Sequence, residues 1–435
     1  MIDSIQRSLS RLLATSCLAL LSIGMTSAQR ADGQQGDEQP RYQVNYRIDL
    51  TGAQRMYVTL TITQSNGALK HMTLVDLGTQ TPVNATAGDV RRNGNDVTWE
   101  VAPTGGALRW DQPVRRTRAN GSVDALRTED WAVLRAEDAI PPIATMTVAG
   151  ADAETTLEFV LPDGWSIATP YTRDDNGSFA VEDNGRRFDK PDGWLVAGDI
   201  GVRRETIAAT QVAIAAPRNA GARRLDTLAF LHWHLPYVRE LFPAFPDRLL
   251  IAMANDPFFR GGLSAPNSLF MHADRPLISG NGTSSLLHEL VHVGFSRTAV
   301  NGEDWIVEGI AEFYSYTLLH RAGSVSDARS DSTQRSLSEW AKRARRLPAK
   351  ASTGSRTAMA AGVFVELADE IKRRTRDKKS IDDVIVRMAN KPEKVSLTEL
   401  RQAARAVIGK PSETLADDNL PGYPIVAKEP STDGR

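Results

Sequence analysis

Cysteine is almost absent from this sequence: Cys17 is the single thiol among 435 residues. A chain with one cysteine forms no internal disulfide, and cysteine-rich zinc sites are excluded as well. Cys17 lies in an apolar stretch (residues 12–25) that follows Arg7 and Arg11 and ends in small residues. This pattern predicts a secretory signal over residues 1–28. We therefore expect an exported protein, periplasmic or secreted, whose mature chain has no thiol.

Long apolar runs and an excess of one charge are also lacking. Beyond residue 28 no apolar run is long enough to cross a bilayer, so no integral membrane segment is expected in the mature chain. Lysine and arginine number 52 and aspartate and glutamate 53, which gives a net charge of −1. The basic runs at residues 342–346 and 372–379 are short, so neither nucleic acid nor an anionic membrane is an expected partner.

Apolar and polar residues alternate between residues 41 and 206. Every second residue is apolar over residues 42–50, and residues 56–62 and 97–101 repeat the pattern. Such alternation predicts strands with one buried face, and Asn-Gly and Asp-Gly turns separate them. We therefore expect a β domain, sandwich-like or a curved sheet, after a flexible polar leader at residues 29–40.

After residue 206 the pattern becomes mixed and then helical. Apolar runs at residues 249–253 and 268–272 predict two strands joined by a loop at Gly261 and Gly262. Several segments with helical spacing follow. The sequence thus predicts an α+β multidomain chain, with these parts: the β domain (41–206), a second domain (207–334), a helical domain (335–410) and an extended tail (411–435).

The segment His288-Glu-Leu-Val-His292 carries the chemistry. Two residues four apart share one face of a helix, so both imidazoles can meet one cation. Glu289 lies one step round the helix, where it can reach a water on that cation without binding the ion. With a carboxylate from elsewhere in the chain as third ligand, the two imidazoles leave the fourth tetrahedral position of Zn²⁺ open. This arrangement is typical of a catalytic site. If this apolar segment were buried without a metal, the two histidines and Glu289 would lack polar partners, which is energetically unfavourable.

A third ligand is expected from the next helix. The segment that starts with Asp304 and Trp305 has helical spacing to about Gly323, with Asp304 as its cap. Glu308 is the best candidate for the ligand. Glu312, one turn further on, either accepts a hydrogen bond from a liganding histidine or is a solvated acid of an amphipathic helix.

Simpler interpretations compete with the zinc site. The two histidines could be satisfied core residues beside a surface Glu-Gly pair. A second metal site at His232 and His234 is not expected, because residues two apart on a helix point to different faces. Ordinary packing is the interpretation we prefer for that pair.

The Gly261-Gly-Leu-Ser264 segment, the His-Glu-x-x-His helix and Asp304-Trp-x-x-Glu308-Gly together resemble the glycyl aminopeptidase family of gluzincin zinc metallopeptidases. The resemblance is clear from residue 249 to residue 407 and weaker over the β domain. It implies a thermolysin-like (gluzincin) catalytic domain at residues 207–334, between the β domain and a helical part. It also implies that His288, His292 and Glu308 bind zinc, and that Glu289 is the general base and acid.

The sequence departs from that family at three points. The PDZ domain that many members carry is not expected here. The resemblance implies that Gly261, Gly262 and Ser264 contact the substrate. The family has a glutamate at the position of Ser264, however, and that glutamate binds the α-ammonium group of the substrate. At the position of Met359 the family has a tyrosine that donates a hydrogen bond to the oxyanion. Loss of such a donor lowers the reaction rate by about a hundred- to a thousand-fold.

Our leading hypothesis is an exported zinc metallopeptidase that acts on peptide or protein substrates, as an aminopeptidase or an endopeptidase. The alternative is a zinc-binding, weakly active or inactive peptidase-like protein, which the residues at 264 and 359 favour. The intact Glu289 argues against that alternative, since a binding protein needs no general base. A third interpretation, a β-domain recognition module supported by the helices, predicts no stoichiometric zinc.

Overall fold

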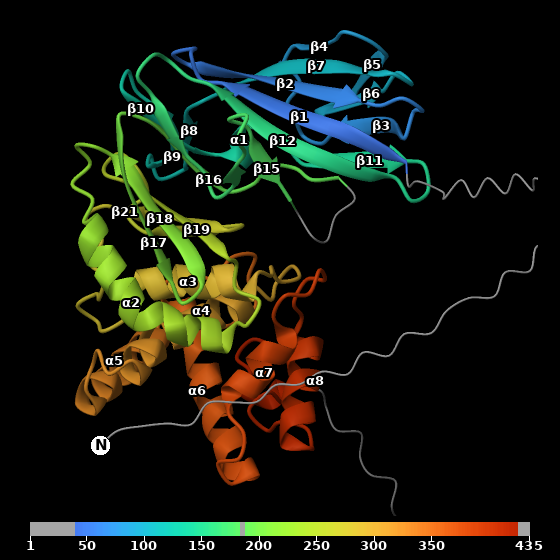
Figure 1. Ribbon diagram of the computed structural model, residues 1–435. Helices are drawn as coiled ribbons and strands as arrows, with labels where there is room; N and C mark the ends of the chain where they lie inside the picture. Colours follow the sequence, from blue (N-terminus) through green and yellow to red (C-terminus); the bar gives the residue numbers. More distant parts are fainter. Residues whose placement is uncertain (1–39, 183–187, 425–435) are drawn as a thin grey trace, which may run out of the picture. The chain divides into compact units, whose positions relative to one another are not determined.

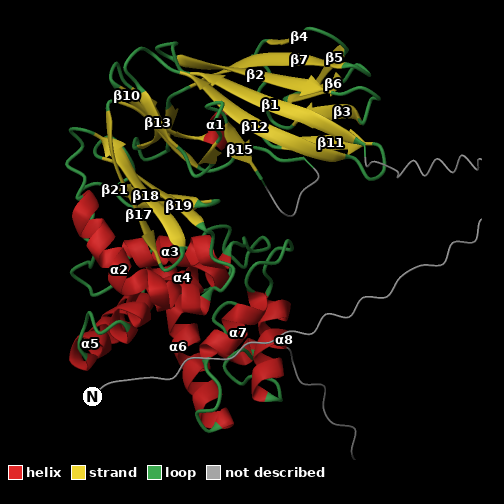
Figure 2. Cartoon of the chain, in the orientation of Figure 1, coloured by secondary structure: helices red, strands yellow, loops and turns green. Residues whose placement is uncertain are grey.

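The computed structural model describes residues 40–182 and 188–424. The predicted signal (1–28) and leader (29–40) therefore lie outside the described residues, except for Pro40. Strands form the first half of the described chain and helices dominate the second (Figure 2). This confirms the expected mixture of α and β structure. Among the described helices, none is both long and apolar enough to cross a membrane.

Three sheets share one core in the first part of the chain (Figure 1). The largest has the order β14-β15-β12-β1-β2-β7-β4: β1 (Arg41–Asp49), β2 (Arg55–Thr63), β4 (Val83–Ala85), β7 (Gly105–Pro113), β12 (Asp152–Val160), β14 (Thr172–Arg173) and β15 (Phe179–Val181). A second has the order β11-β3-β6-β5: β3 (Leu69–Leu74), β5 (Asp89–Asn93), β6 (Asp96–Glu100) and β11 (Ile143–Thr147). The third has the order β13-β16-β10-β9-β8, with helix α1 after β10: β8 (Arg116–Thr117), β9 (Val123–Arg127), β10 (Trp131–Arg135), α1 (Ala136–Ala139), β13 (Ser166–Ala168) and β16 (Trp194–Gly198).

The period-two pattern determines which face of each strand is buried. In β1, Tyr42, Val44, Tyr46 and Ile48 are all buried, while the residues between them are partly or fully exposed. β1 pairs antiparallel with β2 on one side and parallel with β12 on the other. It therefore lies inside the seven-stranded sheet, between a strand close to it in sequence and one far from it.

A fourth sheet has the order β17-β18-β19-β21-β20: β17 (Ile200–Ile207), β18 (Thr210–Pro217), β19 (Arg248–Ala254), β20 (Gly262–Ala265) and β21 (Ser268–His272). Its three inner strands are parallel, and both edge strands run antiparallel to their neighbours. The expected boundary after residue 206 falls inside β17. The expected Gly261–Gly262 loop is also wrong in part, because Gly262 begins β20, whose hydrogen bonds with β21 make it an edge strand.

Seven helices and one 3₁₀ turn follow or flank this sheet in the described residues: α2 (Arg224–Leu241), α3 (Ser285–Phe295), α4 (Trp305–Arg321), α5 (Asp327–Ala341), α6 (Ser355–Thr375), α7 (Ile381–Met388), α8 (Leu397–Ile408) and η1 (Asp417–Asn419). Their apolar faces form one continuous core with strands of the fourth sheet, from Ile207 to Leu420. The helices after residue 334 therefore share a core with the metal-site helices rather than having one of their own.

The segment after α8 differs from the extended tail that we expected. Over its described part, to residue 424, it contains η1 and returns to the helices. Leu415 and Leu420 are buried, and the Tyr423 hydroxyl accepts a hydrogen bond from Trp305 Nε1 at 2.9 Å. These apolar contacts fold the segment back, which its Pro-Gly-rich sequence does not indicate.

The β sheets and the fourth sheet are joined by a buried aromatic contact. Trp194 of β16 packs against Phe270 of β21 with ring centroids 5.1 Å apart. The backbone N–H of Trp194 donates to Ser268 Oγ at 2.9 Å. Both tryptophan and phenylalanine are fully buried, so this contact fixes β21 and its edge partner β20 against the β sheets.

Candidate metal centre

Helix α3 carries both histidines. Ser284 is its N-cap, and its hydroxyl accepts a hydrogen bond from the backbone N–H of Leu287 at 3.3 Å. Leu290 and Val291 are buried, which holds the helix in the core. His288 and His292 therefore lie on the same face, with ring centroids 4.8 Å apart.

Glu308 comes from the first turn of α4. Asp304 precedes this helix as predicted, but its side chain does not cap it, because Oδ2 accepts from the backbone N–H of Ser352 at 2.6 Å. Gly309 has a packing role. A Cβ at this position would lie 2.8 Å from Cβ of Ala360, so glycine allows α4 to approach α6 and keeps Glu308 in place.

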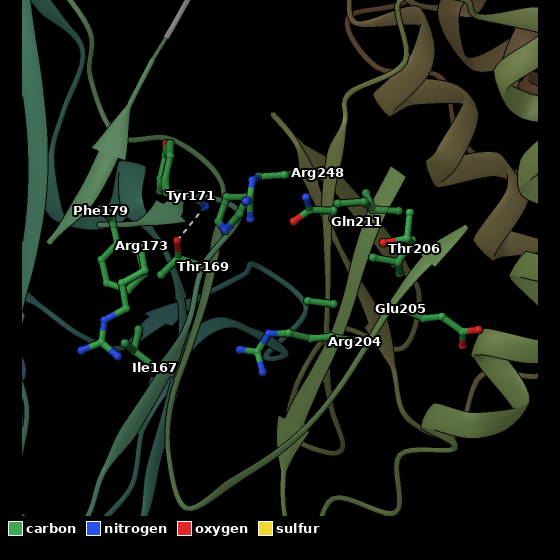
Figure 3. A pocket seen from close by; sticks show the side chains of 14 residues that line it. Ile167, Thr169, Tyr171, Arg173, Phe179, Arg204, Glu205, Thr206, Gln211 and Arg248 are labelled. Atoms are coloured by element: carbon green, nitrogen blue, oxygen red, sulfur yellow. Dashed lines mark hydrogen bonds between the residues drawn. The ribbon is translucent and has the colours of Figure 1, made fainter. Parts of the chain in front are cut away.

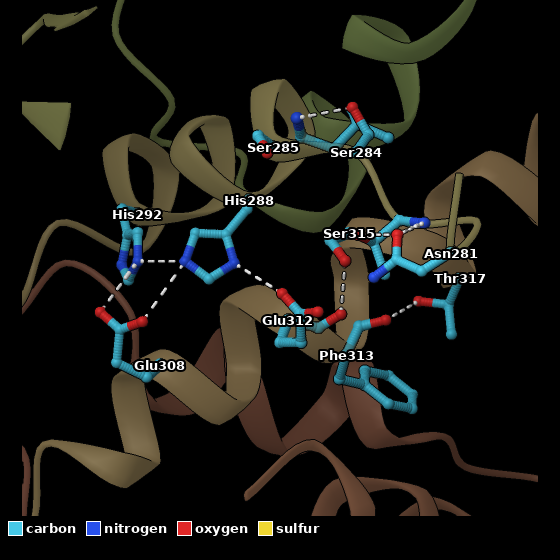
Figure 4. Close-up of polar contacts among 12 residues, drawn as sticks. Asn281, Ser284, Ser285, His288, His292, Glu308, Glu312, Phe313, Ser315 and Thr317 are labelled. Atoms are coloured by element: carbon cyan, nitrogen blue, oxygen red, sulfur yellow. Dashed lines mark hydrogen bonds and ion pairs between the residues drawn. The ribbon is translucent and has the colours of Figure 1, made fainter. Parts of the chain in front are cut away.

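The structure brings His288, His292 and Glu308 together (Figure 4). The two Nε2 atoms are 3.1 Å apart, and each lies 3.4 Å from an oxygen of Glu308. Ligand atoms around a tetrahedral zinc ion are separated by about 3.3 Å, given zinc–nitrogen bonds of about 2.0–2.1 Å. This is the one group of three or more such side chains in the described residues that could hold a metal. The donor set and its spacing fit zinc.

The charges of these side chains also suit a cation. Burial lowers the pKa of His288, but its hydrogen bonds with Glu308 and Glu312 outweigh burial and raise that pKa well above its usual value. Burial, together with the charge of His288, lowers the pKa of His292 to about 4. Burial favours a higher pKa for Glu308, but both histidines lower it. The carboxylates of Glu308 and Glu312 therefore stabilise a positive charge at His288.

Glu312 lies behind His288. Its Oε2 is 3.1 Å from Nδ1 of His288, on the side of the ring opposite Glu308 (Figure 4). A carboxylate here accepts the Nδ1–H, so the lone pair of Nε2 faces the metal position. Of the two interpretations that the sequence left open for Glu312, this contact favours the hydrogen-bonded one.

Glu289 lies under the edge strand β20. A Cβ on Gly262 would be 2.4 Å from Glu289 Cγ, so glycine is required where the strand crosses this side chain. Burial, reinforced by the charge of Glu308, raises the pKa of Glu289 to about 7. The charge of His288 and hydrogen bonding from Ser264 limit that rise. The contact of Ser264 with Glu289 was not predicted, because nothing in the sequence indicates which strand covers the helix.

The other candidate residues lie outside this group. Met359 packs against the helical core. His232 pairs with Glu205 at the surface, whereas His234 is buried and bonds to the carbonyl of Phe230, so the two point apart as expected. Gly261 bonds through its carbonyl to the backbone N–H of His272.

No protein-family model and no curated protein matches this sequence. Solved structures do match it. The chain is similar to the aminopeptidase N family protein from Idiomarina loihiensis, with a TM-score of 0.59 and 15% identity over 86% of this chain and 72% of that one.

It is also similar to the M1 zinc metallopeptidase from Deinococcus radiodurans, with a TM-score of 0.55 and 17% identity over 90% of this chain and 96% of that one. One structure of that enzyme holds a Tyr-Ser-Ala substrate. At such identities the likeness concerns the fold. The chain therefore has the fold of the M1 zinc metallopeptidases, and the glycyl aminopeptidase subfamily stays a prediction.

Proposed function

We propose that this protein is a zinc-dependent metallopeptidase that hydrolyses peptide bonds in peptide or protein substrates. The observation that carries the proposal is the grouping of His288, His292 and Glu308 beside the buried carboxylate of Glu289. The fold shared with M1 zinc metallopeptidases supports it. Export, to the periplasm or out of the cell, belongs to the proposal and rests on the signal pattern of residues 1–28 alone.

His288, His292 and Glu308 would hold the zinc ion, which when bound supplies Lewis acidity towards a carbonyl oxygen and lowers the pKa of water towards neutrality. Glu289 has the role of general base and then general acid. With a pKa of about 7 it is partly ionised at neutral pH, so it can take a proton from the attacking water and return it to the leaving amine. Glu312 orients His288 through the Nδ1 hydrogen bond.

We further propose that the substrate lies along β20, in contact with Gly261, Gly262 and Ser264. β20 is an edge strand, so one side of its backbone is available to an extended peptide. Its residue Gly262 lies against Glu289, so a peptide bound along β20 would lie near the base. None of the four residues of β20 is acidic, so this strand offers no carboxylate for a free α-ammonium. Cleavage of blocked peptides is therefore part of the proposal.

The alternative, a weakly active or inactive peptidase-like protein that binds zinc, keeps two observations in its favour. Ser264 lies beside Glu289, and the Met359 side chain packs against the helical core and has no polar donor. The buried, base-like Glu289 favours the active enzyme.

Metal analysis combined with a peptide-library digest tests the proposal. Purified wild type is expected to hold one zinc per chain and to cleave peptides, while a variant with both His288→Ala and His292→Ala holds none. Zinc removal is also expected to lower the melting temperature, because the buried ligands lose their partner. Full zinc content in the double variant would end the zinc assignment. One zinc without cleavage of any peptide would favour the alternative.

A further inference from the structure

A cavity of about 380 Å³ lies between two parts of the chain, and none of the metal-site residues lines it. One wall comes from the segment that runs from β13 to β15, and the other from β17, β18 and the start of β19 (Figure 3). Three arginines, Arg173, Arg204 and Arg248, line this arginine cavity.

The three guanidinium groups have no counter-charge. Within residues 40–182 and 188–424, no carboxylate forms an ion pair with any of them. Arg173 donates one hydrogen bond, from Nε to the carbonyl of Gly177, and Arg204 and Arg248 donate none through their side chains to described residues. Arg173 lies over the Phe179 ring, 5.9 Å from its centroid, so Arg204 and Arg248 are the arginines whose donors are available to a ligand.

The single acid in the lining does not neutralise them. Glu205 Oε1 is 2.8 Å from Nε2 of His232. Figure 3 shows its carboxylate directed away from the cavity, while the guanidinium groups of Arg204 and Arg248 extend towards the opposite wall. The charge that a ligand meets is therefore positive.

The opposite wall, which also carries Thr169 and Arg173, presents a tyrosine ring that is fixed in place. The Tyr171 hydroxyl donates to the carbonyl of Asp192 at 2.7 Å and accepts from the backbone N–H of the same residue at 2.6 Å. The ring is therefore held in place, and Phe179 and Ile167 lie on the same wall. A ligand that fills this space needs oxyanion groups on one side and a compact apolar body on the other. Inorganic anions alone would leave these apolar side chains in water.

We propose that the arginine cavity binds a small organic polyanion. Its phosphate or carboxylate oxygens contact Arg204 and Arg248, and its body lies against Tyr171 and Phe179. Guanidinium groups recognise both kinds of oxyanion through paired hydrogen bonds, so the head group is left to experiment. Binding in this cavity does not require peptidase activity.

Calorimetric titration of the purified protein at constant ionic strength tests it, with phenyl phosphate and phthalate as probes. Inorganic phosphate and phenol serve as controls that lack the body or the charge. Wild type is expected to bind one molecule of at least one probe, with a dissociation constant below about 1 mM, and to bind both controls at least about ten-fold more weakly. The probe that binds identifies the head group.

Substitution of the arginines tests whether the probe binds in this cavity. The double variant Arg204→Gln/Arg248→Gln is expected to lose at least about ten-fold in affinity, because two charge-assisted contacts are removed. Arg203→Gln is the matched control, since Arg203 is an exposed arginine of the same strand that does not line the cavity. Thermal unfolding verifies that each variant is folded. Because Arg248 is partly buried, the exposed Arg204 is also changed alone, with a loss of at least about three-fold expected.

Two outcomes would overturn the proposal. One is equal affinity in wild type and in the folded Arg204→Gln variant. The other is the absence of saturable binding of either probe by wild type up to about 10 mM, a concentration at which even weak specific sites are occupied. Inorganic phosphate that binds as tightly as phenyl phosphate would contradict the role of Tyr171 and Phe179.

Discussion

Replacement of Glu312 separates the role of a metal ligand from that of a residue that orients one. Its Oε2 lies 3.1 Å from Nδ1 of His288, and its side chain is largely buried. Glu312→Ala removes the acceptor of the Nδ1–H, so the imidazole loses both its fixed tautomer and its orientation. Glu312→Gln keeps a neutral acceptor, and therefore loses the charge but not the hydrogen bond.

The expected losses follow from these contacts. Removal of a carboxylate that orients a liganding histidine costs about 10–100-fold in metal affinity, which corresponds to about 1.4–2.7 kcal/mol. We expect Glu312→Ala to lie in this range and Glu312→Gln to lose less. Glu308→Ala removes a carboxylate whose two oxygens each lie 3.4 Å from an imidazole Nε2, and we expect a larger loss. The predicted order of zinc affinity is wild type, Glu312→Gln, Glu312→Ala and Glu308→Ala.

Competition with a chromogenic chelator at fixed pH measures these affinities, and plasma emission analysis gives the zinc content. Glu366→Ala is the control, since Glu366 is an exposed glutamate of α6 away from the cluster. Circular dichroism of each variant tests whether the helices are intact. If Glu312→Ala lost more affinity than Glu308→Ala in folded protein, Glu312 would be the ligand and our assignment would be reversed.

Three further predictions follow from the site and its surroundings. Glu289→Gln is expected to keep zinc and fold and to lose at least about a hundred-fold in peptide hydrolysis, because the amide cannot accept the proton; unchanged turnover would mean another base. N-acetylated peptides are expected to be cleaved at least as well as matched free peptides, and Ser264→Glu to shift preference towards free amino ends by about ten-fold or more. A strong wild-type preference for free amino ends, seen in paired peptide assays, would contradict this. Hydrogen bonds from Ser412 and from the backbone at residues 413 and 414 outweigh the effect of burial and lower the pKa of Glu370 from 4.5 to about 2. Its ionised form therefore stabilises the fold by about 3 kcal/mol above pH 4.5, and this is lost as the pH falls towards about 2. Chemical unfolding of Glu370→Gln should show that deficit at pH 7 but not near pH 2, and a deficit equal at both pH values would exclude the charge as its cause.

The spacing of apolar residues predicted the strands and helices in which buried residues recur at a regular interval. The alternation of apolar and polar residues in β1 predicted that Tyr42 and Val44 lie on its buried face. The four-residue spacing of His288 and His292 predicted that they share one helix face. The choice of Glu308 over Glu312 rested on the Trp-x-x-Glu-Gly pattern, which is part of the family resemblance. In each case residues near one another in sequence decide the geometry, so the sequence alone is informative.

Tertiary contacts account for what the sequence did not predict. β20 has four residues, all partly exposed, and therefore no periodicity that marks it as a strand. Asp304 has the composition of a cap, but the backbone of Ser352, which arrives from far along the chain, takes its carboxylate. The arginine cavity likewise requires Arg173 and Arg248 to come together from separate sheets.

The place of β1 inside its sheet has a consequence for synthesis of the chain. β2 and β7 can add to one side of β1 as soon as they emerge, but the strand that covers its other side, β12, pairs residues 111 positions away. Until residue 160 has been made, β1 exposes a row of unpaired backbone groups next to Tyr42, Tyr46 and Ile48. Such an open edge is a template for pairing with another chain. The N-terminal sheet therefore has an edge that needs protection while the chain is incomplete.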